Sequence, residues 1–390
     1  MTIPITKPFF GAEEMRAVQL PLESGWVVQG PFVRDFEKRF SAFTRASFSA
    51  ATSSCTTALH LAVAALDLQP GDDVIVPAFT WVSTANVVEY MGARPVFADV
   101  DLETFNIAPA AAAAAVTART VGMIPVHLFG LCADMNALGE LASQRSLWSV
   151  EDAACAFGTR SKGRHAGTFG DFGCFSFHPR KSITTGEGGM VTTMRSELHE
   201  KVSSLRDHGA TKSDRDRHEQ SGSFLLASYP YLGYNYRLTD IQGALGCAQI
   251  ARADVLLAGR ARVAERYHEL LHGLDWLVLP STPEGDDHGW QSYVCLFRPE
   301  APSMTNVERL HQRRNALMAV MEKQGIATRQ GTHAPVIQEF YANKYGFRPG
   351  DFPNAYMADR LSLSLPLYPH MTDAEIEVVV SALRSAIDAA

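Results

Sequence analysis

Short apolar runs alternate with stretches of helical periodicity over the first two-thirds of the chain, and this alternation constrains the fold most strongly. Between several of these runs, apolar residues recur at helical spacing, as Ala58, Leu61, Ala62 and Ala65 do. Strand and helix in alternation predict an α/β fold with a mostly parallel sheet and helices on both faces. The runs are short and apolar, as strands buried on both faces are, and five are expected to be strands: Val74–Val76, Pro95–Phe97, Gly122–Ile124, Leu147–Val150 and Cys174–Phe177.

The pattern changes after about residue 200. Helices are expected over about 241–271, over 307–324 and from Thr372 onward, with strands at 290–294 and near Ile326. Thr372 and Glu375, three residues apart, are typical of a capping box. The chain has 390 residues, enough for two to three domains. We predict a large domain over 1–250, with the N-terminal segment, and a smaller C-terminal α+β domain over 251–390, with the connecting helix. The polar stretch 207–230 is predicted to be a long surface or active-site loop.

Composition and charge exclude several classes of protein. The net charge of −7 argues against a nucleic-acid-binding surface, which is usually basic. There is no run of about 18 apolar residues, so no transmembrane helix is expected. The six cysteines are scattered and form no CxxC pair, which argues against a metal ribbon or a redox motif. Together with the lack of a signal-peptide pattern, they indicate a cytoplasmic protein without a metal.

Two ionisable residues lie beside predicted strands. Asp152 follows an apolar strand, where ligands bind in open α/β sheets, although Asp is also a common helix N-cap. Lys181 stands between a strand and the glycine-rich turn 186–189. Burial and a nearby cation would lower the pKa of its amine and make it a Schiff-base nucleophile. The alternatives are an ordinary surface lysine and a tight turn without function.

Two further features complete a recognisable set. Small hydroxyl residues over 52–57 open a helix, where free backbone amides bind phosphate, although they could also serve as simple caps. Trp81 follows a strand and could stack on a flat ring, or pack in the core. An acid, a lysine, a phosphate cradle and an aromatic plate at one sheet edge are what pyridoxal 5'-phosphate requires.

The chain resembles the sugar aminotransferases of the DegT/DnrJ/EryC1/StrS family, pyridoxal-phosphate enzymes of fold type I. The resemblance runs from Ser24–Pro31 to Leu365–Pro369, and its most specific part is Phe175–Gly189. It implies that Lys181 forms the Schiff base and shuttles the proton, and that Asp152 pairs with the pyridine nitrogen. It also implies the remaining cofactor contacts: Trp81 stacking on the ring, and Thr56, Thr57 and Ser176 on the phosphate.

The resemblance also bears on assembly. Asn235 matches a residue that reaches the phosphate from the neighbouring subunit, which implies a homodimer with active sites at the subunit interface.

Cys155 stands where many members carry His or Gln near the phenolic oxygen of the cofactor. Because a thiol is a weak hydrogen-bond partner, Cys155 is a candidate cofactor contact that departs from the family pattern.

The implied reaction is a ping-pong transamination from glutamate to a nucleotide-linked keto sugar. A lysine at position 181, where related dehydratases have His, favours transamination over dehydration. The runs 206–209 and 328–333 are similar to members resembling GDP-perosamine synthase, which implies a 4-keto-6-deoxy hexose. A 3-keto sugar, a keto cyclitol and a non-catalytic cofactor-binding regulator remain alternatives. The candidate substrate residues are His208, Arg237, Arg329 and His333, and Arg206 or Lys212 could also meet a diphosphate.

Overall fold

The computed structural model describes residues 2–211 and 228–387. Its central element is a seven-stranded sheet in the order β1-β9-β8-β5-β4-β2-β3. Its strands are β1 Phe48–Thr52, β2 Asp73–Pro77, β3 Arg94–Ala98, β4 Thr120–Met123, β5 Trp148–Asp152, β8 Phe172–Ser176 and β9 Gly189–Thr193. The five predicted strands are therefore present as β2, β3, β4, β5 and β8, with shifts of a few residues at their ends.

One strand of this sheet runs against the others. β9 is antiparallel to both of its neighbours, β1 and β8, whereas β8, β5, β4, β2 and β3 are paired in parallel. The sheet is thus mostly parallel, as predicted. The reversal places Gly189, where β9 begins, beside Ser176, where β8 ends. The segment 177–188, which carries Lys181, therefore leaves and re-enters the sheet at the same edge.

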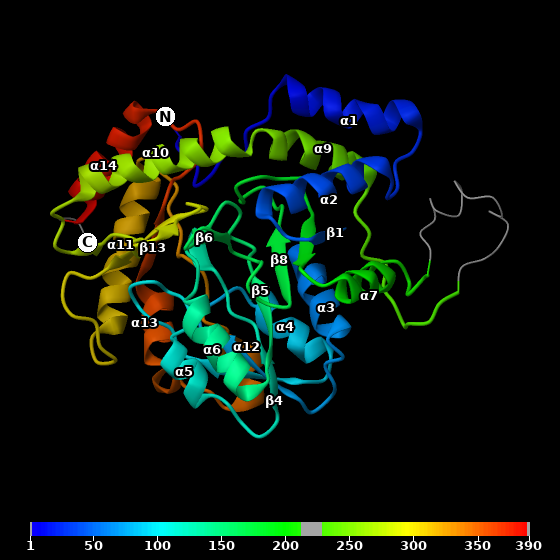
Figure 1. Ribbon diagram of the computed structural model, residues 1–390. Coiled ribbons are helices and arrows are strands. Elements are labelled where there is room, and N and C mark those ends of the chain that lie inside the picture. Colours follow the sequence, from blue (N-terminus) through cyan, green and yellow to red (C-terminus); the bar gives the residue numbers. More distant parts are fainter. Residues whose placement is uncertain (1, 212–227, 388–390) are drawn as a thin grey trace.

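Helices cover both faces of the sheet, as the sequence predicts. One apolar core joins the sheet to α3, α4 and α7, and a second joins its other face to α2, α6 and α9. Figure 1 shows α1, α2 and α9 together along one side of the sheet. The bounds of these helices and of α5 are α1 Ala12–Ser24, α2 Pro31–Thr44, α3 Cys55–Ala65, α4 Ser83–Tyr90, α5 Pro109–Ala114, α6 Met135–Arg145, α7 Ser196–Arg206 and α9 Asp240–Ala251.

The C-terminal third adds a smaller α+β layer. Its antiparallel sheet has the order β10-β12-β13 and shares a third apolar core with α10, α11 and α14. Ile3 also enters this core and pairs with Ile326. The elements are α10 Ala253–Leu271, β10 Leu277–Val278, β12 Tyr293–Phe297, α11 Val307–Lys323, α12 Glu339–Tyr345, α13 Pro353–Leu361, β13 Ser362–Leu365 and α14 Asp373–Ala386. The domain boundary at residue 250 stays a prediction.

Several C-terminal details differ from the sequence prediction. The strand expected at 290–294 begins at Tyr293, because the backbone at Trp290 has a positive φ of 44° and cannot continue a strand. Ile326 forms an isolated bridge rather than a strand. The helix expected over 241–271 is interrupted at Arg252. The capping box is confirmed, since Thr372 accepts from the amide of Glu375, and the Glu375 side chain accepts from the amide of Thr372.

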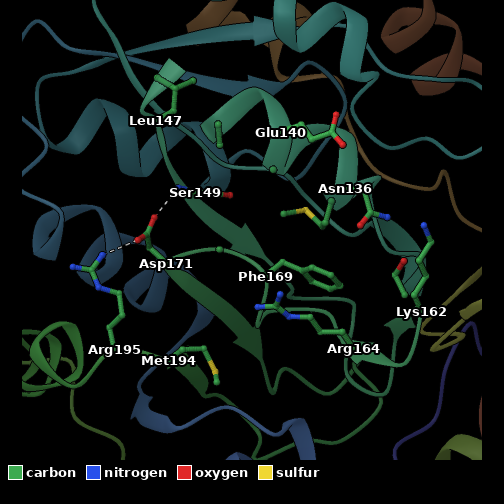
Figure 2. Close-up of a pocket in the computed structure, with 15 residues that line it drawn as sticks. Asn136, Glu140, Leu147, Ser149, Lys162, Arg164, Phe169, Asp171, Met194 and Arg195 are labelled. Atoms are coloured by element: carbon green, nitrogen blue, oxygen red, sulfur yellow. Dashed lines mark hydrogen bonds and ion pairs between the residues drawn. The ribbon is translucent and has the colours of Figure 1, made fainter. Parts of the chain in front are cut away.

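A pocket of about 730 Å³ lies at the edge of the sheet where β5 and β8 begin (Figure 2). Several of its charged side chains already have partners, since Arg195 pairs with Asp171 at 3.0 Å and Arg164 lies over the ring of Phe169. Nearby, a small sheet is formed by β6 Arg160–Ser161, β7 Arg164–His165 and β11 Asp286–Asp287. The residues predicted to carry chemistry lie at the opposite edge, where β5 and β8 end.

None of the helices within residues 2–211 and 228–387 combines the length and the apolar character needed to cross a membrane. All six cysteines are free thiols. The stretch 207–230 was predicted to be one long loop. Its described ends are irregular apart from a bridge between Asp207 and Asn235, and its centre lies outside the described residues.

Candidate active site

Asp152 is the last residue of β5 and presents a buried carboxylate at the C-terminal edge of the sheet. Thr84 on α4 donates to one carboxylate oxygen at 2.8 Å, and the amide of Ala154 donates to the other at 3.2 Å. Burial raises the pKa of Asp152, although both hydrogen bonds oppose this rise. No helix begins after Asp152, so the alternative of a helix N-cap is wrong. A buried carboxylate of this kind favours a cationic partner.

Lys181 lies in the segment between β8 and β9, and its Nζ donates to the sulfur of Cys155 at 3.1 Å. Burial by itself lowers the pKa of the Lys181 amine, but Cys155, Cys55 and Asp152 outweigh it and raise the pKa. The prediction that a nearby cation lowers the pKa of Lys181 is therefore wrong. The protein groups around the amine are sulfur atoms and a carboxylate, which raise its pKa. The same interactions place Lys181, which is half-buried, and the buried Asp152 in one cluster.

The first turn of α3 adjoins this cluster. Ser54 caps the helix by accepting from the amide of Thr57, and the Thr57 hydroxyl accepts from the amide of Ser54 in return. Thr56 lies half-buried on the same turn. Ser176 and Thr52 both pair with Gly189 on β9, so the end of β8 stands close to the start of α3. The alternative of a simple cap is therefore confirmed for Ser54 and Thr57. A cap of this kind satisfies only some of the first backbone amides of a helix, and the others suit a phosphate group.

Trp81 precedes α4 and is 59% exposed, which excludes the alternative of core packing. Its ring centroid lies 5.8 Å from that of His333, and the amide of Thr80 donates to the carbonyl of His333 at 2.9 Å. The structure therefore brings His333, a candidate substrate residue, beside the predicted stacking residue.

The other candidate residues lie farther along the chain. Asn235 is exposed and forms a backbone bridge with Asp207, whose carboxylate pairs with Arg237 at 2.5 Å. His208 is exposed, with a positive φ of 60°. Arg329 is exposed and bridges to Ser364 in the C-terminal layer.

Arg206 and Lys212 were the two further candidates for contacts to a diphosphate. Arg206 is buried, and its guanidinium donates to Glu37 and to the carbonyl of Ala51, both at 2.6 Å. Because Arg206 is buried as well as paired, it is not placed to bind substrate. Lys212 lies outside the described residues.

Sequence reasoning missed the residues that support Asp152. Thr84 is one, through its hydrogen bond to the carboxylate, and His127 is another, because its amide donates to the carbonyl of Asp152 at 3.0 Å while its ring pairs with the buried Glu151. His127 Nδ1 accepts from the amide of Ala133, so its Nε2–H donates to Glu151 at 2.8 Å. Glu151 also accepts from the amides of Gly167 and Gly170. The sequence did contain a signal for a partner of Glu151. Neighbouring strand residues face opposite sides of a sheet, so the adjacent acids Glu151 and Asp152 need separate partners.

Comparison with known proteins assigns the family. Residues 8–384 match the model of the DegT/DnrJ/EryC1/StrS aminotransferase family. The spore coat polysaccharide biosynthesis protein SpsC of Bacillus subtilis is 38% identical over 388 residues, covering 100% of this chain and 98% of that protein. The uncharacterized protein MJ1066 of Methanocaldococcus jannaschii is 36% identical over 385 residues, 99% of this chain and 97% of that protein.

Solved structures agree with this assignment. The putative sugar aminotransferase Spr1654 from Streptococcus pneumoniae, in its PMP form, is 28% identical with a TM-score of 0.91, covering 99% of both chains. S. venezuelae DesV, in complex with a ketimine intermediate, is 30% identical with a TM-score of 0.87, covering 99% of both chains. The chain belongs to the DegT/DnrJ/EryC1/StrS aminotransferase family. It is a sugar aminotransferase of fold type I that depends on pyridoxal phosphate.

The residues at the sheet edge fit this cofactor. Lys181 offers an amine, Asp152 a buried acid, and Trp81 an exposed aromatic face. The capped start of α3 offers amides for a phosphate. Within the described residues, no cluster of three or more His, Cys, Asp or Glu side chains is placed to hold a metal ion.

Proposed function

We propose that the protein moves an amino group from glutamate to a nucleotide-linked keto sugar, in particular a 4-keto-6-deoxy hexose, by a ping-pong mechanism. The observation that carries this proposal is the cluster of the half-buried Lys181, its contact Cys155 and the buried Asp152 at the C-terminal edge of the sheet. The substrate class rests on the resemblance of the runs 206–209 and 328–333 to perosamine-forming members. The names of SpsC, a polysaccharide biosynthesis protein, and of Spr1654, a putative sugar aminotransferase, support a sugar substrate in general.

The chain's own residues have distinct roles in this proposal. Bound pyridoxal phosphate supplies an electron sink for the carbon that loses or gains a proton. Asp152 holds a proton on the pyridine nitrogen, because a buried carboxylate is stabilised by a cation beside it. Lys181 Nζ removes and returns the proton at the substrate carbon in both half-reactions. Trp81 orients the ring by stacking, and Thr56, Thr57 and Ser176 hold the phosphate.

Cys155 contributes a weaker contact in the same cluster. Its sulfur accepts from Lys181 Nζ at 3.1 Å, so it orients the lysine when the amine is free. We propose that it lies beside the phenolic oxygen of the cofactor, where many family members carry His or Gln. On the substrate side, we propose His333, His208, Arg237 and Arg329 as contacts to the sugar and the diphosphate.

We further propose that the protein is a homodimer with active sites at the subunit interface. Asn235 is exposed within one subunit, as a residue that serves a neighbouring site must be. Leu232, three residues earlier, is 93% exposed, and an apolar side chain of this kind suits an interface. Sedimentation analysis tests the dimer. Mixed dimers of Lys181→Ala and Asn235→Ala subunits test shared sites, because such a dimer contains one intact site of two. No recovery of activity on mixing would contradict sharing.

The cytoplasm remains the proposed location. Six free thiols suit a reducing compartment, as do small-molecule substrates made by metabolism. Localisation of a tagged chain by cell fractionation tests this part.

The reaction is tested in two stages. Glutamate alone should convert the cofactor in the wild-type protein, seen by absorbance, and Lys181→Ala should abolish this conversion. Lys162→Ala is the control, because Lys162 lines the pocket at the opposite edge of the sheet. Full activity of Lys181→Ala would overturn the assignment.

A panel of nucleotide-linked keto sugars then identifies the acceptor. We expect an amino product from a 4-keto-6-deoxy hexose. Products only from 3-keto sugars or a keto cyclitol would contradict the substrate class and leave the aminotransferase assignment intact. No conversion of the cofactor by glutamate or any other amino donor would indicate a non-catalytic cofactor-binding protein.

A further inference from the structure

Arg260 on α10 is a buried arginine that meets the backbone of the lysine segment. Its side chain is fully enclosed, with the residue 2% exposed, and burial lowers its pKa to about 10. Nη2 donates to the carbonyl of Lys181 at 3.3 Å, and Nη1 donates to the carbonyls of Trp290 and Gln291 at 3.2 and 3.1 Å. Among the described residues no carboxylate pairs with this guanidinium. Its charge is compensated only by backbone carbonyl groups.

Gln291 makes the second contact to the same segment. Its Nε2 donates to the carbonyl of Arg180 at 2.9 Å, and its Oε1 accepts from the hydroxyl of Ser292. Two consecutive carbonyls, those of Arg180 and Lys181, are therefore held by side chains that come 111 and 79 residues later in the chain. The carbonyl of Gln291 in turn accepts from Arg260, so the two side chains form one unit.

Burying an arginine without a carboxylate is costly, and a chain that needed only packing at this position would be served by an apolar residue. A guanidinium has five donors in a rigid plane, which lets one side chain join three carbonyls from two segments. The unit reaches the lysine through its backbone, so it acts on where Nζ can be placed and not on the reacting atoms themselves.

We propose that Arg260, assisted by Gln291, is a positioning residue that fixes the backbone of Lys181 so that its Nζ reaches the cofactor and the substrate carbon. This inference rests on the proposed role of Lys181. It assigns to the C-terminal layer an indirect part in the chemistry of the large sheet, through the backbone of Lys181. Lysine cannot replace Arg260 in this role, because a single ammonium on a flexible stem cannot hold the three carbonyls in one plane.

Arg260→Lys is the test variant and Arg314→Lys is its matched control. Arg314 on α11 is 1% exposed, and its Nη1 donates to the carbonyl of Ser362 at 2.9 Å. Burial lowers the pKa of Arg314 to about 10 as well. The two substitutions should therefore destabilise the fold to a similar degree. Gln291→Met is a milder second variant, which removes only the donor to Arg180 and serves if Arg260→Lys does not fold.

The main readout is independent of turnover. The full-length chain is freed of cofactor, pyridoxal phosphate is added, and its covalent attachment to Lys181 is followed by absorbance and by borohydride trapping. Arg260→Lys should attach the cofactor about 10- to 100-fold more slowly, since a misplacement near 1 Å costs about that factor. Gln291→Met should show a smaller slowing, and Arg314→Lys the wild-type rate. In steady-state assays kcat should fall with Arg260→Lys while the KM for glutamate changes less than about 2-fold.

Attachment at the wild-type rate in folded Arg260→Lys or Gln291→Met protein would overturn the inference and leave the proposed function standing. Equal slowing in Arg314→Lys would also overturn it, by showing that general destabilisation is the cause. Trapping of the cofactor on a lysine other than Lys181 in the wild-type protein would instead refute the proposed role of Lys181.

Discussion

Replacing Gly189 with alanine should damage the phosphate site that we propose at the start of α3. Gly189 is the first residue of β9 and faces the start of α3. A Cβ there would lie 2.4 Å from the carbonyl carbon and oxygen of Ser54 and 2.7 Å from the amide nitrogen of Cys55. Ordinary contact begins at 3.4 Å, so β9 and the helix start must separate by about 1 Å (3.4 minus 2.4). Both neighbours are backbone and cannot turn away.

The separation has two consequences of different size. Overpacking of a buried position costs about 1–3 kcal/mol of unfolding free energy. The start of α3 would also move away from Ser176, so at least one hydrogen bond to the phosphate that we propose there would be lost. A hydrogen bond to a charged group is worth about 1.5–3 kcal/mol, which corresponds to a Kd about 10- to 150-fold weaker.

The assay is a titration of the cofactor-free chain with pyridoxal phosphate, together with a melting curve for each variant. Gly139→Ala on α6 is the control, because a Cβ there meets nothing within 4 Å. In the middle of a helix this change should stabilise the fold by about 0.5–1 kcal/mol and leave the affinity unchanged. A wild-type affinity in Gly189→Ala would refute the placement of the phosphate at the start of α3.

Two other predictions concern the ring and the sheet. Trp81→Ala should weaken cofactor binding by about 2- to 12-fold, the factor that corresponds to losing about 0.5–1.5 kcal/mol of aromatic stacking. Titration with the cofactor measures this loss. The melting temperature should not fall, because the Trp81 side chain is 59% exposed. Asp73 is fully buried; burial raises its pKa, but hydrogen bonds from Arg94 and Thr117 outweigh this and lower it below 3.8. Its stabilising contribution is therefore present above about pH 4 and lost as the pH falls through the folded-state pKa, so Asp73→Asn should cost about 1–3 kcal/mol at pH 7 and flatten the acid limb of the stability curve measured by urea unfolding.

The strands that the sequence revealed are those buried on both faces by apolar residues. β2 Asp73–Pro77 and β8 Phe172–Ser176 carry this pattern clearly. β1 Phe48–Thr52 and β9 Gly189–Thr193 were not predicted, because their small and hydroxyl-bearing residues have little apolar signal. They are strands because each pairs with the other along its whole length. This pairing joins segments that are far apart in the sequence, so a local pattern does not reveal it.

The part of the site that could be predicted from the sequence consists of residues that stand within a recognisable local motif. Asp152 and Lys181 each stand beside a strand, and the structure brings them into one cluster. The supporting contacts were not predictable. Thr84 reaches Asp152 across 68 residues, and Arg260 reaches Lys181 across 79. The pKa of Lys181 was predicted in the wrong direction, because its sulfur and carboxylate neighbours come from distant segments.

The reversed direction of β9 also has a consequence for how the chain folds. Because β8 and β9 meet at Ser176 and Gly189, the lysine segment closes through contacts that are near in sequence, and such loops close at low entropic cost. The contact from Arg260 requires α10, which is synthesised much later. A nascent or truncated chain that ends before α10 would therefore hold Lys181 in its loop. It would lack the contact from Arg260 that, by our inference, positions the lysine. In this respect, the ability to capture the cofactor would be acquired late in synthesis, when the last third of the chain docks onto a sheet that is already formed.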